Sequence, residues 1–158
     1  MLMSSTHTTD TASPMRLIGQ ISRTFARVVD APLRDLGLAI GQLPVLVTLK
    51  RNGALSQAEL AHIAQVEQPS MAQLLNRMER QGLVERVLDP NDARRRLISL
   101  TTQAAQRMPE GKAIMQSTSE QALEGFSSEE RTQLFTLLER VNGNLKHALQ
   151  AAQAHKEA

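Results

Sequence analysis

Residues 56–101 read SQAELAHIAQVEQPSMAQLLNRMERQGLVERVLDPNDARRRLISLT and specify the central part of the fold. Ser56 and Glu59 have the spacing of a capping box, in which each side chain satisfies a free backbone donor of the other residue, so a helix begins here. Pro69 suits the first turn of a second helix, which Gly82 ends. The sequence therefore predicts two short helices that are separated by a tight turn.

A β-hairpin is predicted directly after the second helix. Residues 83–88 and 96–100 are β-prone, and the DPND sequence at 89–92 is a turn signal. The tip of this hairpin carries Asp92, Arg94 and Arg95. Two helices, a tight turn and a basic hairpin make a winged helix-turn-helix. The second helix of such a unit fits the major groove of duplex DNA, and the hairpin reaches the flanking backbone or minor groove.

Helices are predicted on both sides of this unit. From Pro14 to Leu36 the apolar residues recur at steps of three and four, and the dense apolar run at 41–50 indicates a buried helix. Residues 102–126 have a weak helical pattern, in which Pro109 and Gly111 predict a kink or a break. The fold class is therefore mainly α with a small β-hairpin wing (α+β).

The composition excludes several classes of function. The 158 residues contain no Cys, which rules out disulfides, thiolate metal sites and thiol nucleophiles. No apolar run approaches the roughly 18 residues that cross a membrane, and the polar N-terminus lacks the core of a signal peptide. We therefore expect a cytoplasmic protein with no membrane partner. We find no catalytic constellation, metal-ligand spacing or phosphate loop, so we expect no enzyme activity, no cofactor and no metal site.

The outer face of the second helix and the hairpin provide the candidate DNA contacts. Ser70 and Gln73 can hydrogen-bond base edges, Arg77 and Arg80 can neutralise phosphates, and Arg94 can enter the minor groove. The net charge is only +2, so the placement of arginines matters more than bulk charge. An ordinary solvated helix face is the alternative interpretation. The full set of candidates is Pro69, Ser70, Gln73, Asn76, Arg77, Arg80, Arg86, Asp92, Arg94, Arg95 and Arg96.

The segments SQAELAHIAQVEQPSMAQLLNRMERQGLVER and DPNDARRRLISLT resemble the MarR family of bacterial transcriptional regulators. LEGFSSEERTQLFTLLERV resembles the last helix of that family, and the likeness extends over about residues 15–150. The resemblance implies that Arg94 is the wing arginine and that Asp92 is its acidic partner. Two departures stand out, because Asn76 occupies a position where Asp is frequent and Ala93 occupies one that is often basic.

The resemblance also implies a homodimer in which the first and last helices of two subunits interlock and two wings bind one palindromic site. The predicted division of the chain is then a disordered tail (1–13), a dimerisation helix (14–36), a winged helix-turn-helix domain (37–101, with the helix-turn-helix at 56–79 and the wing at 84–100), C-terminal dimerisation helices (102–153) and a tail (154–158).

Many members of the family bind small anionic aromatic ligands between the dimer helices and the winged domain. The resemblance therefore implies a possible effector. Arg16, Arg23 and Arg27 are candidates to meet its carboxylate, although for each one taken alone a solvated surface position is the favoured interpretation. Met108 and Met115 are candidates to line a pocket.

The function that we predict is a sequence-specific regulator of transcription that binds double-stranded DNA. We expect a homodimeric repressor that a small aromatic or anionic effector releases from a palindromic operator. The alternative is a winged-helix module that binds proteins and not DNA.

Overall fold

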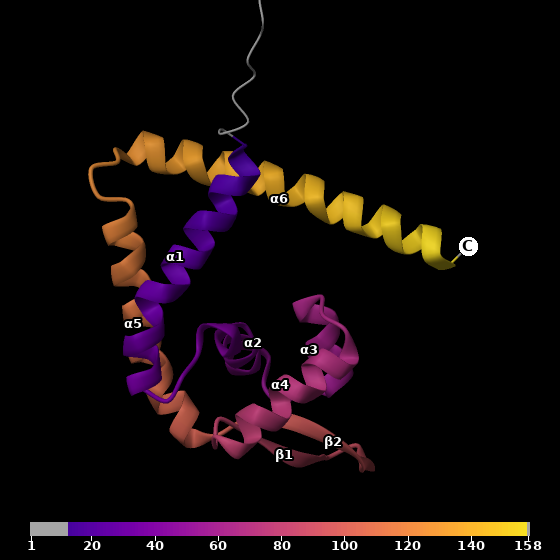
Figure 1. Ribbon diagram of the computed structural model, residues 1–158. Coiled ribbons are helices and arrows are strands. Elements are labelled where there is room, and N and C mark those ends of the chain that lie inside the picture. The colour runs from indigo at the N-terminus through magenta and orange to yellow at the C-terminus, as the bar shows by residue number, and fades with distance from the viewer. Residues whose placement is uncertain (1–12, 158) are drawn as a thin grey trace, which may run out of the picture. The chain divides into compact units, whose positions relative to one another are not determined.

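The computed structural model describes residues 13–157, so all but the last residue of the predicted N-terminal tail lies outside it. The chain forms two compact units, of which one ends at Thr118 and the other begins at Ser119. Figure 1 shows the order of the elements along the chain. They are α1 (Pro14–Asp35), the 3-10 turn η1 (Ile40–Gln42), α2 (Leu43–Asn52), α3 (Gln57–Ala64), α4 (Gln68–Arg80), β1 (Val84–Asp89), β2 (Asp92–Leu100), α5 (Thr102–Ala122) and α6 (Ser128–Glu157).

The helix-turn-helix forms where local signals predict it. The Ser56 amide donates to Glu59 Oε2 at 2.8 Å, and the Glu59 amide donates to Ser56 Oγ at 3.2 Å, which is the reciprocal capping box. Gln65 ends α3 in the left-handed region at φ 53°, and this turns the chain toward α4. The predicted mainly α fold with a hairpin wing is confirmed.

The hairpin begins its second strand earlier than expected. β1 and β2 pair antiparallel from Val84↔Leu100 to Leu88↔Arg96, and a register shift follows before Asp89↔Asp92. Arg94 and Arg95 therefore lie in the irregular end of β2 and not in the connecting turn, which corrects the predicted strand start at residue 96. The shift leaves three residues of β2 between two paired positions, so this end of the strand bulges.

One hydrophobic core holds the first unit together. The C-terminal half of α1 contributes Val29 and Leu33, which are fully buried together with residues of α2, α4 and β2. This half of α1 thus packs with the winged domain, so the compact units differ from the predicted boundary at residue 36. The other fully buried large side chains are Leu46, Leu49, Leu60, Met71, Leu75, Met78, Leu83 and Ile98.

Helix α5 runs through Pro109 and Gly111 as one continuous helix, so of the two predicted outcomes, a kink or a break, the break does not occur. Gly111 is buried, and a Cβ atom built on it would lie 2.9 Å from Leu38 Cδ1 and 3.7 Å from Leu33 Cδ2. The missing side chain therefore lets α5 pack close to these leucines. Tertiary packing outweighs the low helix propensity of glycine here.

The second unit contains the end of α5 and the whole of α6. The Ser127 amide donates to Glu130 Oε2 at 2.8 Å in a second capping box. An ion pair joins Arg131 Nη1 to Glu120 Oε2 at 2.7 Å. Helix α6 extends to Glu157, past the predicted end at residue 153. Six of its large apolar side chains are exposed, and they are Leu134, Phe135, Leu137, Leu138, Leu145 and Leu149, while Val141 is half-buried.

None of the helices in residues 13–157 is both long and apolar enough to cross a bilayer.

Candidate nucleic-acid interface

Helix α4 presents one polar face to solvent. Met71, Leu75 and Met78 are fully buried at helical spacing, which fixes the rotation of the helix about its axis. The opposite side is exposed, and it carries Pro69, Ser70, Gln73, Asn76, Arg77 and Arg80. Ser, Gln and Asn side chains can donate to and accept from base edges, so this face has the chemistry of direct readout.

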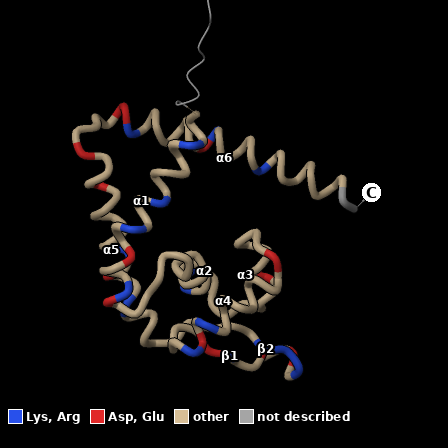
Figure 2. Tube along the Cα trace, in the orientation of Figure 1, with Lys and Arg blue, Asp and Glu red and all other residues tan. Residues whose placement is uncertain are grey.

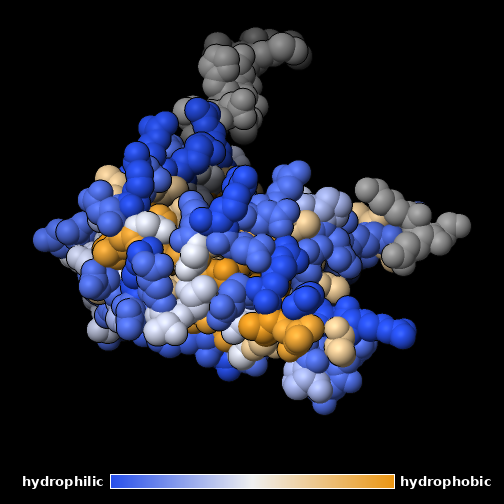
Figure 3. All heavy atoms as spheres, turned by 90° about the horizontal axis from the view of Figure 1, so that it is seen from below, coloured by the Kyte–Doolittle hydropathy of each residue, from blue (hydrophilic) through white to orange (hydrophobic). Residues whose placement is uncertain are grey.

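The hairpin brings further arginines to the same domain. Figure 2 shows basic residues along the hairpin and at its far end. Viewed from the hairpin side, most of the visible surface is hydrophilic, with a few apolar patches (Figure 3). Among the residues that the structure describes, the guanidinium groups of Arg77, Arg80, Arg94 and Arg96 form no ion pair. All four are exposed and available to an anionic partner.

Arg86 is held by its own domain. Its Nε donates to Glu79 Oε2 at 3.1 Å, and its Nη2 donates to Asn76 Oδ1 at 2.8 Å. These two bonds join β1 to α4, which pack against each other. The structure thus brings together two predicted contact residues, Asn76 and Arg86, in a role that the sequence did not predict.

Arg95 also faces carboxylates of the chain. Its Nη1 lies 3.9 Å from Asp89 Oδ2. It also lies near Glu59, whose pKa is held below its ordinary value mainly by the Ser56 hydroxyl, then by the Ser56 backbone amide, and to a smaller extent by the charge of Arg95. The Arg95 side chain is 57% exposed and that of Asp89 is only 10% exposed, and the separation of 3.9 Å is long for an ion pair. Arg95 is therefore less available to an anionic partner than Arg94 or Arg96, but it is not tightly held.

Asp92 acts on the main chain of the wing and not on a guanidinium group. Its Oδ1 accepts a hydrogen bond from the Arg94 backbone amide at 3.0 Å, in an Asx-type turn. The pairing of the Asp92 carboxylate with the Arg94 guanidinium, as the resemblance implied, is absent from the described structure. Asp92 therefore shapes the strand that carries Arg94 and leaves the charge of Arg94 free.

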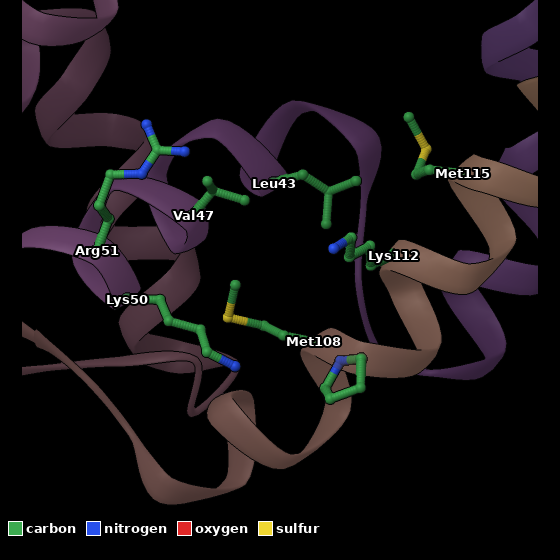
Figure 4. Close-up of a pocket in the computed structure, with 8 residues that line it drawn as sticks. Leu43, Val47, Lys50, Arg51, Met108, Lys112 and Met115 are labelled. Atoms are coloured by element: carbon green, nitrogen blue, oxygen red, sulfur yellow. The ribbon is translucent and has the colours of Figure 1, made fainter.

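A pocket of about 710 Å³ lies between α2 and α5, within the first unit. Leu43 and Val47 from α2 and Met108, Pro109 and Met115 from α5 give it apolar walls. Figure 4 shows Lys50 and Arg51 on one side and Lys112 on the other, so cations from both helices border this space. A volume in this range fits a drug-sized ligand.

The three predicted effector contacts lie elsewhere. Arg16, Arg23 and Arg27 are exposed on α1, and none of them lines this pocket. A Cβ atom on Gly19 would lie 3.3 Å from Arg23 Nη1, so Arg23 lies along its own helix. The prediction that Met108 and Met115 line a pocket is confirmed.

The sequence interpretation missed the cations of the pocket, Lys50, Arg51 and Lys112. A usable signal was present, because Leu43, Val47 and Arg51 recur at steps of four, as do Met108 and Lys112. It does not reveal which two helices face each other.

A second missed contact ties the end of α4 to the start of α2. The Gln42 side chain is buried; its Nε2 donates to Gln81 Oε1 at 2.5 Å, and its Oε1 accepts from the Ala39 amide at 2.9 Å. Gln42 directly precedes the pocket residue Leu43, so the pocket and the C-terminal end of α4 share a fixed support.

The described residues contain no group of three or more His, Asp or Glu side chains that could hold a metal ion.

Comparison with known proteins agrees with this geometry. The sequence profile of the MarR family matches residues 35–95. The Bacillus subtilis (strain 168) HTH-type transcriptional regulator YybA, itself uncharacterised, is 28% identical over 132 residues, which span 84% of this chain and 88% of YybA.

Solved structures give the same answer. A mutant of Escherichia coli MarR complexed with operator DNA is 26% identical, with a TM-score of 0.71 over 80% of this chain and 91% of its own. The transcriptional regulator SlyA is 26% identical, with a TM-score of 0.76 over 86% and 96% of the two chains. A putative MarR family regulator from Listeria monocytogenes complexed with a 26mer DNA is 25% identical, with a TM-score of 0.73 over 85% and 89%.

The paired helices, the hairpin wing and the polar face of α4 define a winged helix-turn-helix protein, and the relatives that it matches are transcriptional regulators. Profile, sequence and structure thus agree that the chain is similar to regulators of the MarR family, and the family profile covers residues 35–95.

Proposed function

We propose that this protein is a cytoplasmic, homodimeric repressor that binds a palindromic operator in duplex DNA. The observation that carries the proposal is the exposed polar face of α4 together with four arginines that form no ion pair with any residue that the structure describes. Helix α4 enters the major groove, where Ser70 and Gln73 contact base edges. Arg77 and Arg80 neutralise phosphates, and Arg94 reaches the adjacent minor groove.

Exposed apolar side chains on two helices support the dimer. Helix α1 exposes Met15, Leu17, Ile21 and Val28, and α6 exposes a longer series from Leu134 to Leu149. Long apolar stripes in water are unfavourable, and a second copy of the chain would cover them. The complexes of Escherichia coli MarR with operator DNA and of the Listeria regulator with a 26mer support DNA as the partner.

The test is titration of the full chain with duplex DNA that carries a fluorescent label. Duplexes selected from a random pool should be palindromic, and the binding constant for them should fall steeply as salt rises, because bound arginines release counterions. Random duplex should bind more weakly but also lose affinity with salt. The alternative, a protein-binding module, requires that neither duplex binds in a salt-dependent way.

The pocket between α2 and α5 is the proposed effector site. Its apolar walls suit a hydrophobic ring, and Lys50, Arg51 and Lys112 suit an acid group. A panel of aromatic acids, each matched with its neutral amide, should raise the melting temperature in the acid form only. The Lys112→Met variant should lose that response, whereas Arg16→Met, which lies outside the pocket, should keep it. A shift that depends on Arg16 would instead favour the site that the sequence predicted.

A further inference from the structure

The Arg86 guanidinium is hydrogen-bonded to Glu79 and Asn76 of α4, and Asn76 lies on the polar face that we expect to contact DNA. We propose that Arg86 is a positioning residue that fixes the Asn76 amide and thereby gives the protein a preference for guanine over adenine at one base of each half-site. This inference rests on the proposed function, because it requires α4 in the major groove.

The hydrogen bond fixes the orientation of the amide. A guanidinium group can only donate, so the Asn76 atom that lies 2.8 Å from Arg86 Nη2 must be the carbonyl oxygen. The Asn76 amino group therefore occupies the other position on the amide. Asn76 is exposed, so its amino group is the part left to meet a base edge.

Glu79 completes the arrangement. It accepts from Arg86 Nε at 3.1 Å, so the guanidinium is bound at two points and its charge is balanced. The Arg86 side chain is 34% exposed, less than that of Arg95 at 57%. Arg86 is thus suited to hold a neighbour and poorly suited to neutralise a phosphate.

Base chemistry then gives the preference. A free Asn pairs with adenine at two points, since it donates to N7 and accepts from the N6 amino group. Here the Asn76 oxygen already holds a cation, and an amino group of adenine would have to approach that cation. Guanine presents two acceptors on the same edge, N7 and O6, which both suit an amide amino group.

The experiment uses operator duplexes that differ by one base pair. Asn76→Ala identifies the position that Asn76 contacts, as the position where its base preference is lost. Wild type should bind guanine about five- to tenfold more tightly than adenine there, as one lost hydrogen-bond pair predicts. Arg86→Met should reduce this ratio to about twofold or less, with the base preferences at other positions unchanged.

Arg80→Met is the matched control, because Arg80 lies on α4 with Asn76 and forms no ion pair within residues 13–157. It should weaken every duplex alike and flatten the salt dependence. The inference is overturned if Arg86→Met behaves as Arg80→Met does, if the guanine preference survives Arg86→Met, or if wild type prefers adenine at the position of Asn76. Absence of salt-dependent binding by wild type would instead overturn the proposed function.

Glu79→Gln tests the inference if Arg86→Met lowers the melting temperature. This variant removes the balancing charge and keeps the bond between Arg86 and Asn76. It should retain the guanine preference while the salt dependence becomes steeper, because Arg86 then carries a free charge. Loss of the guanine preference in this variant would contradict the proposed role.

Discussion

Helices α4 and α6 are both amphipathic, but only α4 buries its apolar side chains within the chain. Met71, Leu75 and Met78 of α4 are fully buried. In α6, Phe135 remains 65% exposed and Leu145 remains 52% exposed. An apolar stripe therefore indicates that a helix packs against a partner. It does not indicate whether that partner belongs to the same chain.

The largest effect is expected from a charge in the α6 stripe. Leu138→Asp places a carboxylate on a surface that we expect to be buried between subunits, where an unpaired charge is strongly unfavourable. The dimer should dissociate, and affinity for a palindromic duplex should fall by about 10²- to 10⁴-fold because the two half-sites are no longer linked. Sedimentation equilibrium and polarisation measure both effects. Gln133→Asp, on another side of α6, should leave the dimer and the DNA affinity unchanged. A Leu138→Asp protein that remains a dimer would contradict the proposed interface.

A cavity in the core of the winged domain should lower the stability of the protein without affecting the dimer. Leu75→Ala removes a fully buried side chain and should lower the free energy of unfolding by about 2–5 kcal/mol. We expect this loss to be the same at all protein concentrations, whereas the loss for Leu145→Ala in α6 should depend on concentration. Denaturant titrations at two concentrations separate the cases. Equal behaviour of the two variants would remove the distinction between α4 and α6.

Neighbouring arginines of the wing should differ in their effect on DNA binding. Arg94 has no ion pair in the described structure, and Arg95 lies 3.9 Å from Asp89. Arg94→Ala should weaken all duplexes by about tenfold and flatten the salt slope by about two ions per dimer, because each wing loses one contact. Arg95→Ala should have a smaller effect in the same titration. The opposite order would mean that Arg95, and not Arg94, is the main contact of the wing.

The smallest effect concerns the start of α3. Ser56→Ala removes the cap and should lower the free energy of unfolding by about 0.5–2 kcal/mol at neutral pH. The folded state lowers the pKa of Glu59, chiefly through the Ser56 hydroxyl, so this contribution is present above the ordinary pKa and is lost as pH falls through the folded pKa. The difference between wild type and Ser56→Ala should therefore shrink in acid. A difference that grows as pH falls would contradict the assigned sign.

The sequence by itself predicted the elements whose signals are local. The Ser56 capping box, Pro69 at the start of α4 and the buried stripe of α4 all depend on residues within a few positions of one another. The exposed residues of α4 followed directly, because burial of one side of a helix fixes the other. Pro109 misled the prediction of a break in α5, since the close packing of Gly111 on Leu38 is not a local property.

Only the tertiary structure decided which polar side chains are free. Arg86 reaches Asn76 because β1 folds back on α4, and Gln42 reaches Gln81 across 39 positions of the sequence. The pocket likewise needs α2 and α5 to lie side by side before Lys50 and Lys112 can border one space. The physical reason is that helix starts and turns form from neighbours along the chain, whereas hydrogen bonds and cavities between elements exist only once the hydrophobic core has brought those elements together.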